Sequence, residues 1–84
     1  MKNYKAVYIE WIDSACTDPS WMSESEAIEW GDDNSNNIIR QVGFLIKKNQ
    51  HTILLAHGIG TDQINGVFKI PVKCISKLTY LSFQ

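Results

Sequence analysis

Apolar and polar residues alternate along the first part of the chain with the period of a β-strand. Within Tyr4–Asp13, the residues Val7, Ile9 and Trp11 fall on one face, because successive side chains of a strand point to opposite faces. The segment is also rich in β-branched and aromatic residues, which favour strands. The pattern predicts a strand here, followed by a loop over residues 14–20, where Ser, Thr, Asp and Pro interrupt the alternation.

A capping box marks the start of one short helix. Ser23 precedes Glu26 by three residues, so the Ser23 hydroxyl can accept from the Glu26 amide while the Glu26 carboxylate reaches back to the Ser23 amide. Gly31 is the expected C-terminal stop, since glycine readily adopts left-handed backbone angles. The predicted helix, about Glu24 to Trp30, is too short to be stable alone. We therefore expect it to lie against the sheet through its apolar residues, Ala27, Ile28 or Trp30.

The second half of the chain, Ile38 to Leu81, predicts four strands joined by short links. Their expected ranges are Ile38–Lys48, Thr52–His57, Val67–Ile70 and Ile75–Leu81. Gly43 within the first of these strands indicates a bulge or a sharp bend. A longer loop is expected from Gly58 to Gly66, and a tight corner from Pro71 to Cys74. The predicted fold is mainly β: a small five-stranded antiparallel barrel, closed or partly open, with one short helix after the first strand.

Two sets of motifs resemble known proteins. The glycine-bearing strand Gly43-Phe44-Leu45-Ile46 and the corner from Pro71 to Cys74 are similar to those of SH3-like or Sm-like barrels. More narrowly, the chain resembles a group of small uncharacterised bacteriophage and prophage proteins. The motifs that carry this second resemblance are Trp11-Ile12-Asp13-Ser14, Trp21-Met22, Val42-Gly43-Phe44-Leu45, and Ile70-Pro71 followed by Ile75. The resemblance implies a virus-encoded accessory protein, and it brings no catalytic residues with it.

The length and charge of the chain limit the number of domains and the kinds of ligand that it can bind. A chain of 84 residues has room for one domain, residues 1–84. The eight Lys and Arg are spread out, with Lys47-Lys48 as the longest run, and the net charge is −1. Strong binding of duplex DNA is not expected, because it needs several cations along the phosphate backbone. A small nucleotide needs only one or two local cations and remains open.

Neither a secretory signal nor a stretch long enough to cross a membrane is evident. We therefore expect a cytoplasmic protein without membrane contact. In that compartment Cys16 and Cys74 are expected to be reduced. A disulfide between them is the less favoured alternative.

The residues that could bind a metal or act in catalysis are not spaced as such sites require. Cys16, Cys74, His51 and His57 lack the close ligand pairs typical of zinc sites. A nucleophile, base and orienting acid could be drawn from Cys16, a histidine and Asp13, but their spacing does not favour that triad. No catalytic residue, metal or cofactor is predicted, and the protein is not expected to be an enzyme.

The glycine pair in Gly58-Ile59-Gly60 lacks the following helix that a phosphate-binding loop requires. It is therefore interpreted as a flexible hairpin link. The same loop could still wrap a ligand, because Asp62, Gln63 and Asn65 offer hydrogen-bonding groups.

All three tryptophans lie in the first third of the chain. They could pack the helix against the barrel, or they could form a stacking platform or the centre of a protein interface. Trp11, on an apolar strand face, fits the core better. Trp21 and Trp30, flanked by polar residues, fit both interpretations equally.

The leading functional hypothesis is a non-enzymatic, homo-oligomeric binding protein of phage type. Its expected ligand is a small nucleotide signal or a host protein, which would give it a role against host defence. An Sm-like RNA-binding protein and a structural or assembly component of a phage particle are the alternatives. The candidate ligand-binding residues are Trp21, Trp30, Arg40, Lys47, Lys48, Asp62 and Asn65, with Lys69 as a further anion contact.

Overall fold

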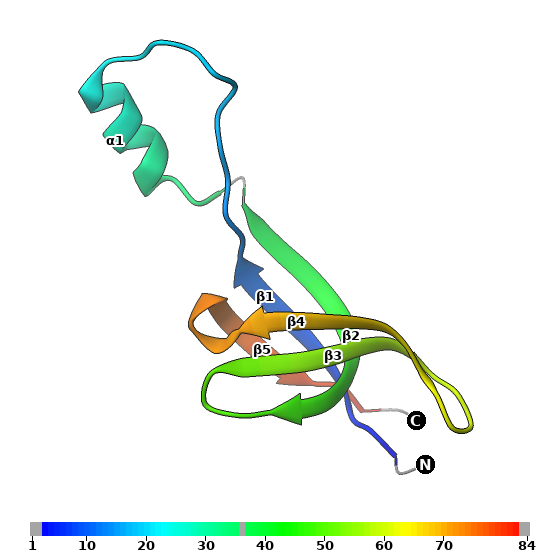
Figure 1. Ribbon diagram of the computed structural model, residues 1–84. Coiled ribbons are helices and arrows are strands. Elements are labelled where there is room, and N and C mark those ends of the chain that lie inside the picture. Colours follow the sequence, from blue (N-terminus) through cyan, green and yellow to red (C-terminus); the bar gives the residue numbers. More distant parts are fainter. Residues whose placement is uncertain (1–2, 36, 83–84) are drawn as a thin grey trace.

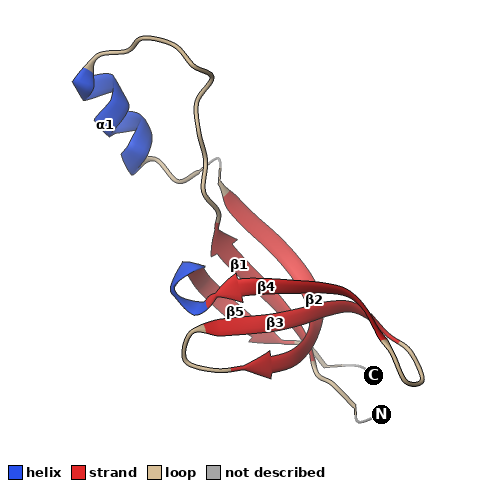
Figure 2. Ribbon diagram, in the orientation of Figure 1, coloured by secondary structure: helices blue, strands red, loops and turns tan. Residues whose placement is uncertain are grey.

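The computed structural model describes residues 3–35 and 37–82. These residues form five strands, one α-helix and one short 3₁₀ helix (Figure 1). In chain order the elements are β1 (Ala6–Ile12), α1 (Glu24–Asp32), β2 (Ile38–Lys48), β3 (Thr52–Ile59), β4 (Ile64–Pro71), η1 (Val72–Cys74) and β5 (Ile75–Tyr80). All strand pairs are antiparallel, in one sheet of order β4-β3-β2-β1-β5 (Figure 2). The predicted mainly-β fold with one short helix after the first strand is confirmed.

The sheet curls until β3 and β4 lie across β1 and β5 (Figure 1). The long strand β2 makes the curl possible, because it pairs with β1 as far as Phe44 and with β3 from Phe44 onwards. The hydrophobic core fills the space between the two halves of the sheet. Its buried members are Val7, Ile9, Trp11, Ile53, Leu55 and Ile70. The predicted inward face of the first strand is therefore confirmed.

The bulge in β2 does not lie at Gly43, where the sequence placed it. The register between β2 and β3 shifts between Leu45 and Lys47, so Ile46 is the extra residue. Gly43 serves close packing instead, since a Cβ there would lie 3.2 Å from the Ala56 carbonyl oxygen and 3.3 Å from the Leu55 Cβ. The glycine lets β3 approach, and the bend follows three residues later.

The corner between the last two strands agrees with the prediction. Residues Val72–Cys74 form one 3₁₀ turn after Pro71. The turn is tied to the β2–β3 connection, because the Val72 amide donates to the His51 carbonyl over 2.9 Å. This bond holds β4 and β5, the two edge strands of the sheet, at their common end.

The predicted loop from Gly58 to Gly66 is largely a β-hairpin, so this prediction is wrong. β3 continues to Ile59 and β4 begins at Ile64, with Gly58 opposite Asn65. The turn is closed by the Gly60 amide, which donates to the Gln63 carbonyl over 2.8 Å. Glycines and polar residues suggested a loop, but backbone pairing to the neighbouring strand overrides that local preference.

Two expectations about the helix are also wrong. The helix runs through Gly31 to Asp32 and is capped at its end by Asp33 in extended conformation, so Gly31 is not a left-handed stop. None of its nine residues is buried, and α1 projects from the barrel instead of lying on it (Figure 1). The capping box is present as predicted, with the Glu26 amide donating to the Ser23 hydroxyl over 3.2 Å.

Candidate functional site

The connection between β1 and β2 forms an arm, which we define as residues 13–37. It carries α1 away from the barrel, and the molecule extends 54 Å along its long axis but only 25 and 22 Å across (Figure 1). Two hydrogen bonds close the root of the arm. The Asp13 amide donates to the Asn37 carbonyl over 2.9 Å, and the Asn37 side-chain amide donates to the Asp13 carbonyl over 2.7 Å. The β1–β2 ladder therefore continues one step into the arm.

The arm exposes large apolar side chains. Trp21 is fully exposed, Ile28 is 56% exposed and Trp30 is 43% exposed. Met22, just before the helix, is also exposed. Burial of a Trp side chain removes a large apolar area from water, so exposed tryptophans are characteristic of interaction sites. Of the two interpretations of Trp21 and Trp30, core packing against the barrel is therefore wrong.

Charge is divided sharply between the arm and the barrel. The arm holds seven of the nine acidic residues and none of the eight Lys and Arg. The rest of the chain holds all eight basic residues and only two acidic ones, Glu10 and Asp62. A count of charges for each predicted segment would have found this asymmetry, which the net charge of the whole chain conceals.

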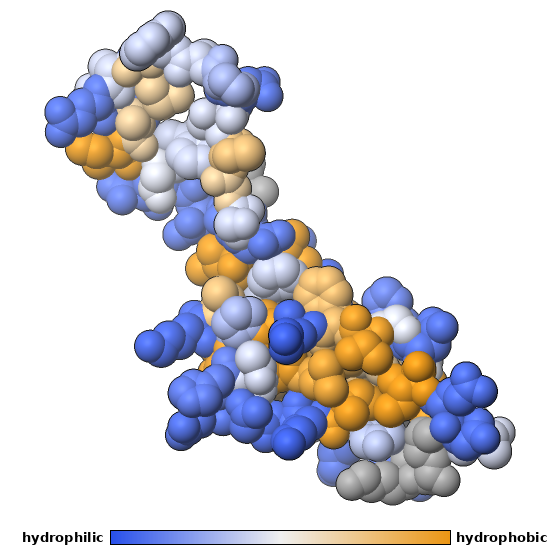
Figure 3. All heavy atoms as spheres, viewed as in Figure 1, coloured by the Kyte–Doolittle hydropathy of each residue, from blue (hydrophilic) through white to orange (hydrophobic). Residues whose placement is uncertain are grey.

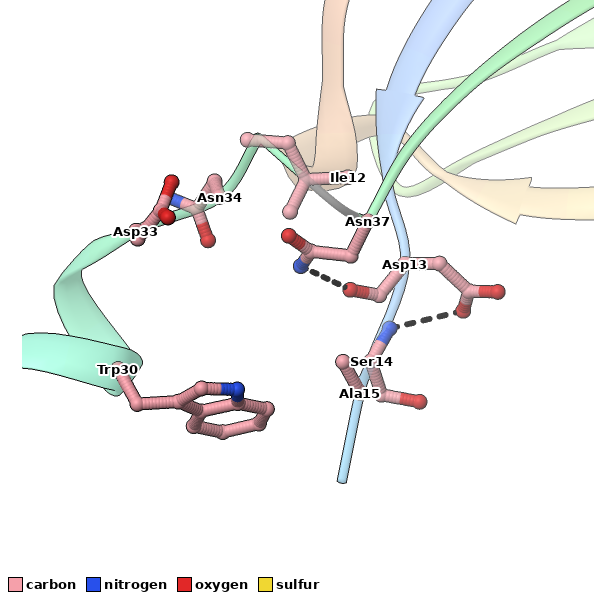
Figure 4. A pocket seen from close by; sticks show the side chains of 9 residues that line it. Ile12, Asp13, Ser14, Ala15, Trp30, Asp33, Asn34 and Asn37 are labelled. Atoms are coloured by element: carbon pink, nitrogen blue, oxygen red, sulfur yellow. Dashed lines mark hydrogen bonds between the residues drawn. The ribbon is translucent and has the colours of Figure 1, made fainter. Parts of the chain in front are cut away.

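A cavity of about 350 Å³ lies at the root of the arm, between the end of α1 and the chain leaving β1 (Figure 4). Its described lining contains no Lys or Arg and consists of Ile12, Asp13, Ser14, Ala15, Trp30, Gly31, Asp33, Asn34 and Asn37. The Trp30 indole and the Asn37 amide face the hollow, whereas the Asp13 carboxylate turns away from it to accept from the Ser14 amide (Figure 4). The cavity thus offers one aromatic face and amide groups.

Asp33 stabilises the wall of this cavity. Its carboxylate accepts from the Ser35 amide over 3.0 Å, and hydrogen bonding from Ser35 lowers the pKa of Asp33 below its usual value. A second hollow of about 430 Å³ is lined by Met22, Glu26, Glu29, Trp30 and Asp33. Trp30 and Asp33 therefore line both hollows, and the described lining of neither contains a Lys or Arg that could bind a phosphate group.

The structure does not bring the seven predicted ligand-binding residues together. Trp21 and Trp30 lie in the arm, Lys47 and Lys48 at the far end of β2, and Asp62 and Asn65 at the β3–β4 hairpin (Figure 1). Arg40 lies on β2, where its Nε is 3.9 Å from a Glu10 carboxylate oxygen. Residues this dispersed cannot surround one small ligand.

Glu10 also accepts a hydrogen bond from the Tyr8 hydroxyl over 2.5 Å. This bond, with burial and the nearby carboxylate charge, raises the pKa of Tyr8 above its usual value. The group lies on the outer face of β1, opposite the core.

Trp11 and the two cysteines lie at separate places in the fold. Trp11 is buried, donates from its indole Nε1 to the Gln41 side chain over 3.1 Å, and packs against Phe68 with ring centroids 5.8 Å apart. Cys16 in the arm and Cys74 in η1 are free thiols. Within residues 3–35 and 37–82, no three His, Cys, Asp or Glu side chains are grouped so that they could hold a metal ion.

The part of the chain that the structure describes contains no helix of the length and apolar character needed to cross a membrane. Comparison of the chain with protein-family models, curated proteins and solved structures found no match. The resemblance to phage proteins therefore stays a prediction, and the arm is the candidate functional site on its own geometry.

Proposed function

We propose that this protein is a non-enzymatic binding protein whose arm is the binding element and whose barrel is the scaffold. One observation carries the proposal: Trp21, Ile28 and Trp30 are exposed on a segment that projects from the barrel. Exposed aromatic residues impose a cost in water unless a partner covers them. The predicted phage origin and the predicted homo-oligomer would supply two kinds of partner, a host protein and a second copy of the chain.

The partner is expected to combine basic and apolar side chains. The arm has seven acidic residues and no compensating Lys or Arg, so a basic surface would be attracted to it and an acidic surface repelled. The tryptophans would then supply the buried contacts that charge alone does not provide.

Fluorescence anisotropy with labelled peptides tests this proposal. A synthetic peptide of alternating lysine and leucine is expected to bind, and a glutamate–leucine peptide of the same length is expected not to bind. The double variant W21A/W30A keeps every charge of the arm, so an interaction through charge alone would survive in it. We expect its affinity for the lysine–leucine peptide to fall by more than about tenfold, as for interface tryptophans generally.

The variant Y80A is the matched control, because it removes an aromatic residue that is 54% exposed on β5, outside the arm. It should bind the peptide as the native protein does. Unchanged binding by a correctly folded W21A/W30A protein would overturn the proposal.

A nucleotide-type ligand is the second candidate. The Trp30 indole faces a cavity of about 350 Å³ at the root of the arm, where a base could stack (Figure 4). The described lining offers no cation for the phosphate groups, so this function ranks second. Titration with ATP distinguishes the two, since binding that is lost in W30A would favour the nucleotide.

A further inference from the structure

We propose that the partner of the arm is the barrel of a second copy of this chain, and that the two copies exchange arms around a two-fold axis. This inference rests on the proposed function, because it takes the arm as the binding element and identifies what covers it. Its basis is a surface on the barrel that matches the arm in both apolar character and charge.

That surface follows from the strand register. Ile53 and Leu55 of β3 point into the core, so Leu54 between them points to the outer face of the barrel. Leu54 lies opposite Lys47 of β2 on one side and Lys69 of β4 on the other. One row of the outer face therefore reads lysine, leucine, lysine across three strands.

A second, apolar row runs beside the first. Ala56 follows Leu54 on the same face and, although itself fully buried, lies between Phe44 of β2 and Val67 of β4. Val67 is 57% exposed, as is Val42, which lies two residues before Phe44 on the same face. We define the outer patch as Val42, Phe44, Leu54, Val67, Lys47 and Lys69. Figure 3 views the molecule from the side of β3 and β4 and shows apolar atoms gathered on the barrel, with hydrophilic side chains beside them.

The arm and the outer patch are complementary. The arm presents apolar side chains among seven acidic residues. The outer patch presents Leu54 between two lysines, with further apolar side chains in the adjacent row. Opposite charges around an apolar centre attract the two surfaces to each other and fix their relative position in an interface.

The arm does not reach the outer patch of its own barrel. The hydrogen bonds between Asp13 and Asn37 extend the β1–β2 ladder into the arm and direct it away from the barrel, along the long axis of the molecule (Figure 1). Contact between arm and patch is thus favoured between copies, and symmetry makes each copy both donor and acceptor of an arm.

Charge reversal with mixing tests the proposal by sedimentation equilibrium at low salt. The first variant, E29K/D32K, reverses two charges at the end of α1 and leaves the Ser23–Glu26 capping box intact. The second variant, K47E/K69E, reverses the lysines of the outer patch. We expect the native protein to be a dimer and each variant alone to be a monomer, because both of its arm–patch contacts are weakened or repulsive.

Mixing the two variants is the decisive step. In the mixed dimer, the two reversed charges at the end of α1 of one copy meet the two reversed charges of the outer patch of the other, and the second arm–patch contact is the native one. Dimers should therefore form again on mixing and dissociate at high salt. Far-UV circular dichroism of each variant confirms that it is folded.

Three results would overturn the inference: a native protein that stays monomeric at low salt, a dimer that neither charge reversal nor W21A/W30A affects, or folded charge-reversal variants that form no dimers when mixed. A native monomer that still binds the lysine–leucine peptide through Trp21 and Trp30 would refute the self-association alone and leave the proposed function standing. Failure of both measurements would refute both.

Discussion

The side-chain amide of Asn37 donates to the main-chain carbonyl of Asp13 over 2.7 Å, across the root of the arm. The Asp13 amide also donates to the Asn37 carbonyl. These two bonds lie where the β1–β2 ladder ends and the arm begins. This pair of residues therefore joins the two ends of the arm that carries Trp21, Trp30 and the acidic residues.

Replacing Asn37 by alanine should loosen the arm without unfolding the barrel. The variant N37A loses the side-chain bond but keeps the backbone bond, at a cost of about 0.5–1.5 kcal/mol. Hydrogen exchange followed by mass spectrometry should show faster exchange over residues 13–35, with the protection of β3 and β4 unchanged. The variant N34A keeps the bond to Asp13 and is the control. Equal exchange in both variants would contradict the role given to Asn37.

Removing the helix cap should unwind α1 and leave the barrel stable. Ser23 accepts from the Glu26 amide over 3.2 Å, and an N-cap serine contributes about 0.5–2 kcal/mol to its helix. No residue of α1 is buried, so tertiary contacts do not compensate for that loss. Circular dichroism of S23A should show less helix, while its Tm stays that of the native protein.

The variant S25A provides the comparison for the cap, since it replaces a helical serine by a good helix former and keeps Ser23. Its helix content should match or exceed that of the native protein. A large fall in Tm for S23A would mean that α1 supports the barrel after all.

Gly66 should not tolerate a side chain. Its φ angle is +69°, and a Cβ there would lie 2.8 Å from the Cβ of His57 on the neighbouring strand. We expect the variant G66A to lose about 1–3 kcal/mol of unfolding free energy in urea denaturation, from backbone strain and steric overlap. G58A in the same hairpin is the matched control, because a Cβ at Gly58 meets nothing within 4 Å. Similar losses in the two variants would refute this explanation.

Stability at alkaline pH should depend on Tyr8. Hydrogen bonding to the Glu10 carboxylate raises the pKa of Tyr8 above 10.0. A group whose pKa is higher in the folded state contributes stability below its unfolded pKa, and this contribution is lost as the pH rises through the folded value. Urea denaturation should therefore show native protein more stable than Y8F at neutral pH. The difference should vanish at pH values above the Tyr8 pKa. A difference independent of pH would contradict this.

Several features follow from local sequence because their causes are local. Alternation places Val7, Ile9 and Trp11 on the buried face of β1, and a strand has no freedom to rearrange that order. The capping box at Ser23 and the corner at Pro71 also arise from residues close together in the chain. For these elements the predicted and observed structures agree.

Contacts between residues that are distant in the sequence determine the features that local patterns did not predict. Gly58 to Gly66 has the composition of a loop, yet pairing between β3 and β4 makes most of it a hairpin. The direction of the arm depends on Asp13 meeting Asn37, residues 24 positions apart, and no local pattern encodes that contact. The exposure of Trp21 and Trp30 is likewise a property of the placement of the arm, which residue type and spacing do not give.

The sequence by itself determined the approximate positions of the five strands, the buried face of β1, the capped start of the helix and the division of charge, because each depends on residue types and their spacing along one segment. Only the tertiary structure decided where the bulge lies, how far β3 and β4 pair, and that the acidic arm projects from the barrel while Lys47 and Lys69 flank Leu54 on its outer face. These relationships depend on strand register and on contacts between distant residues, which chain order does not specify.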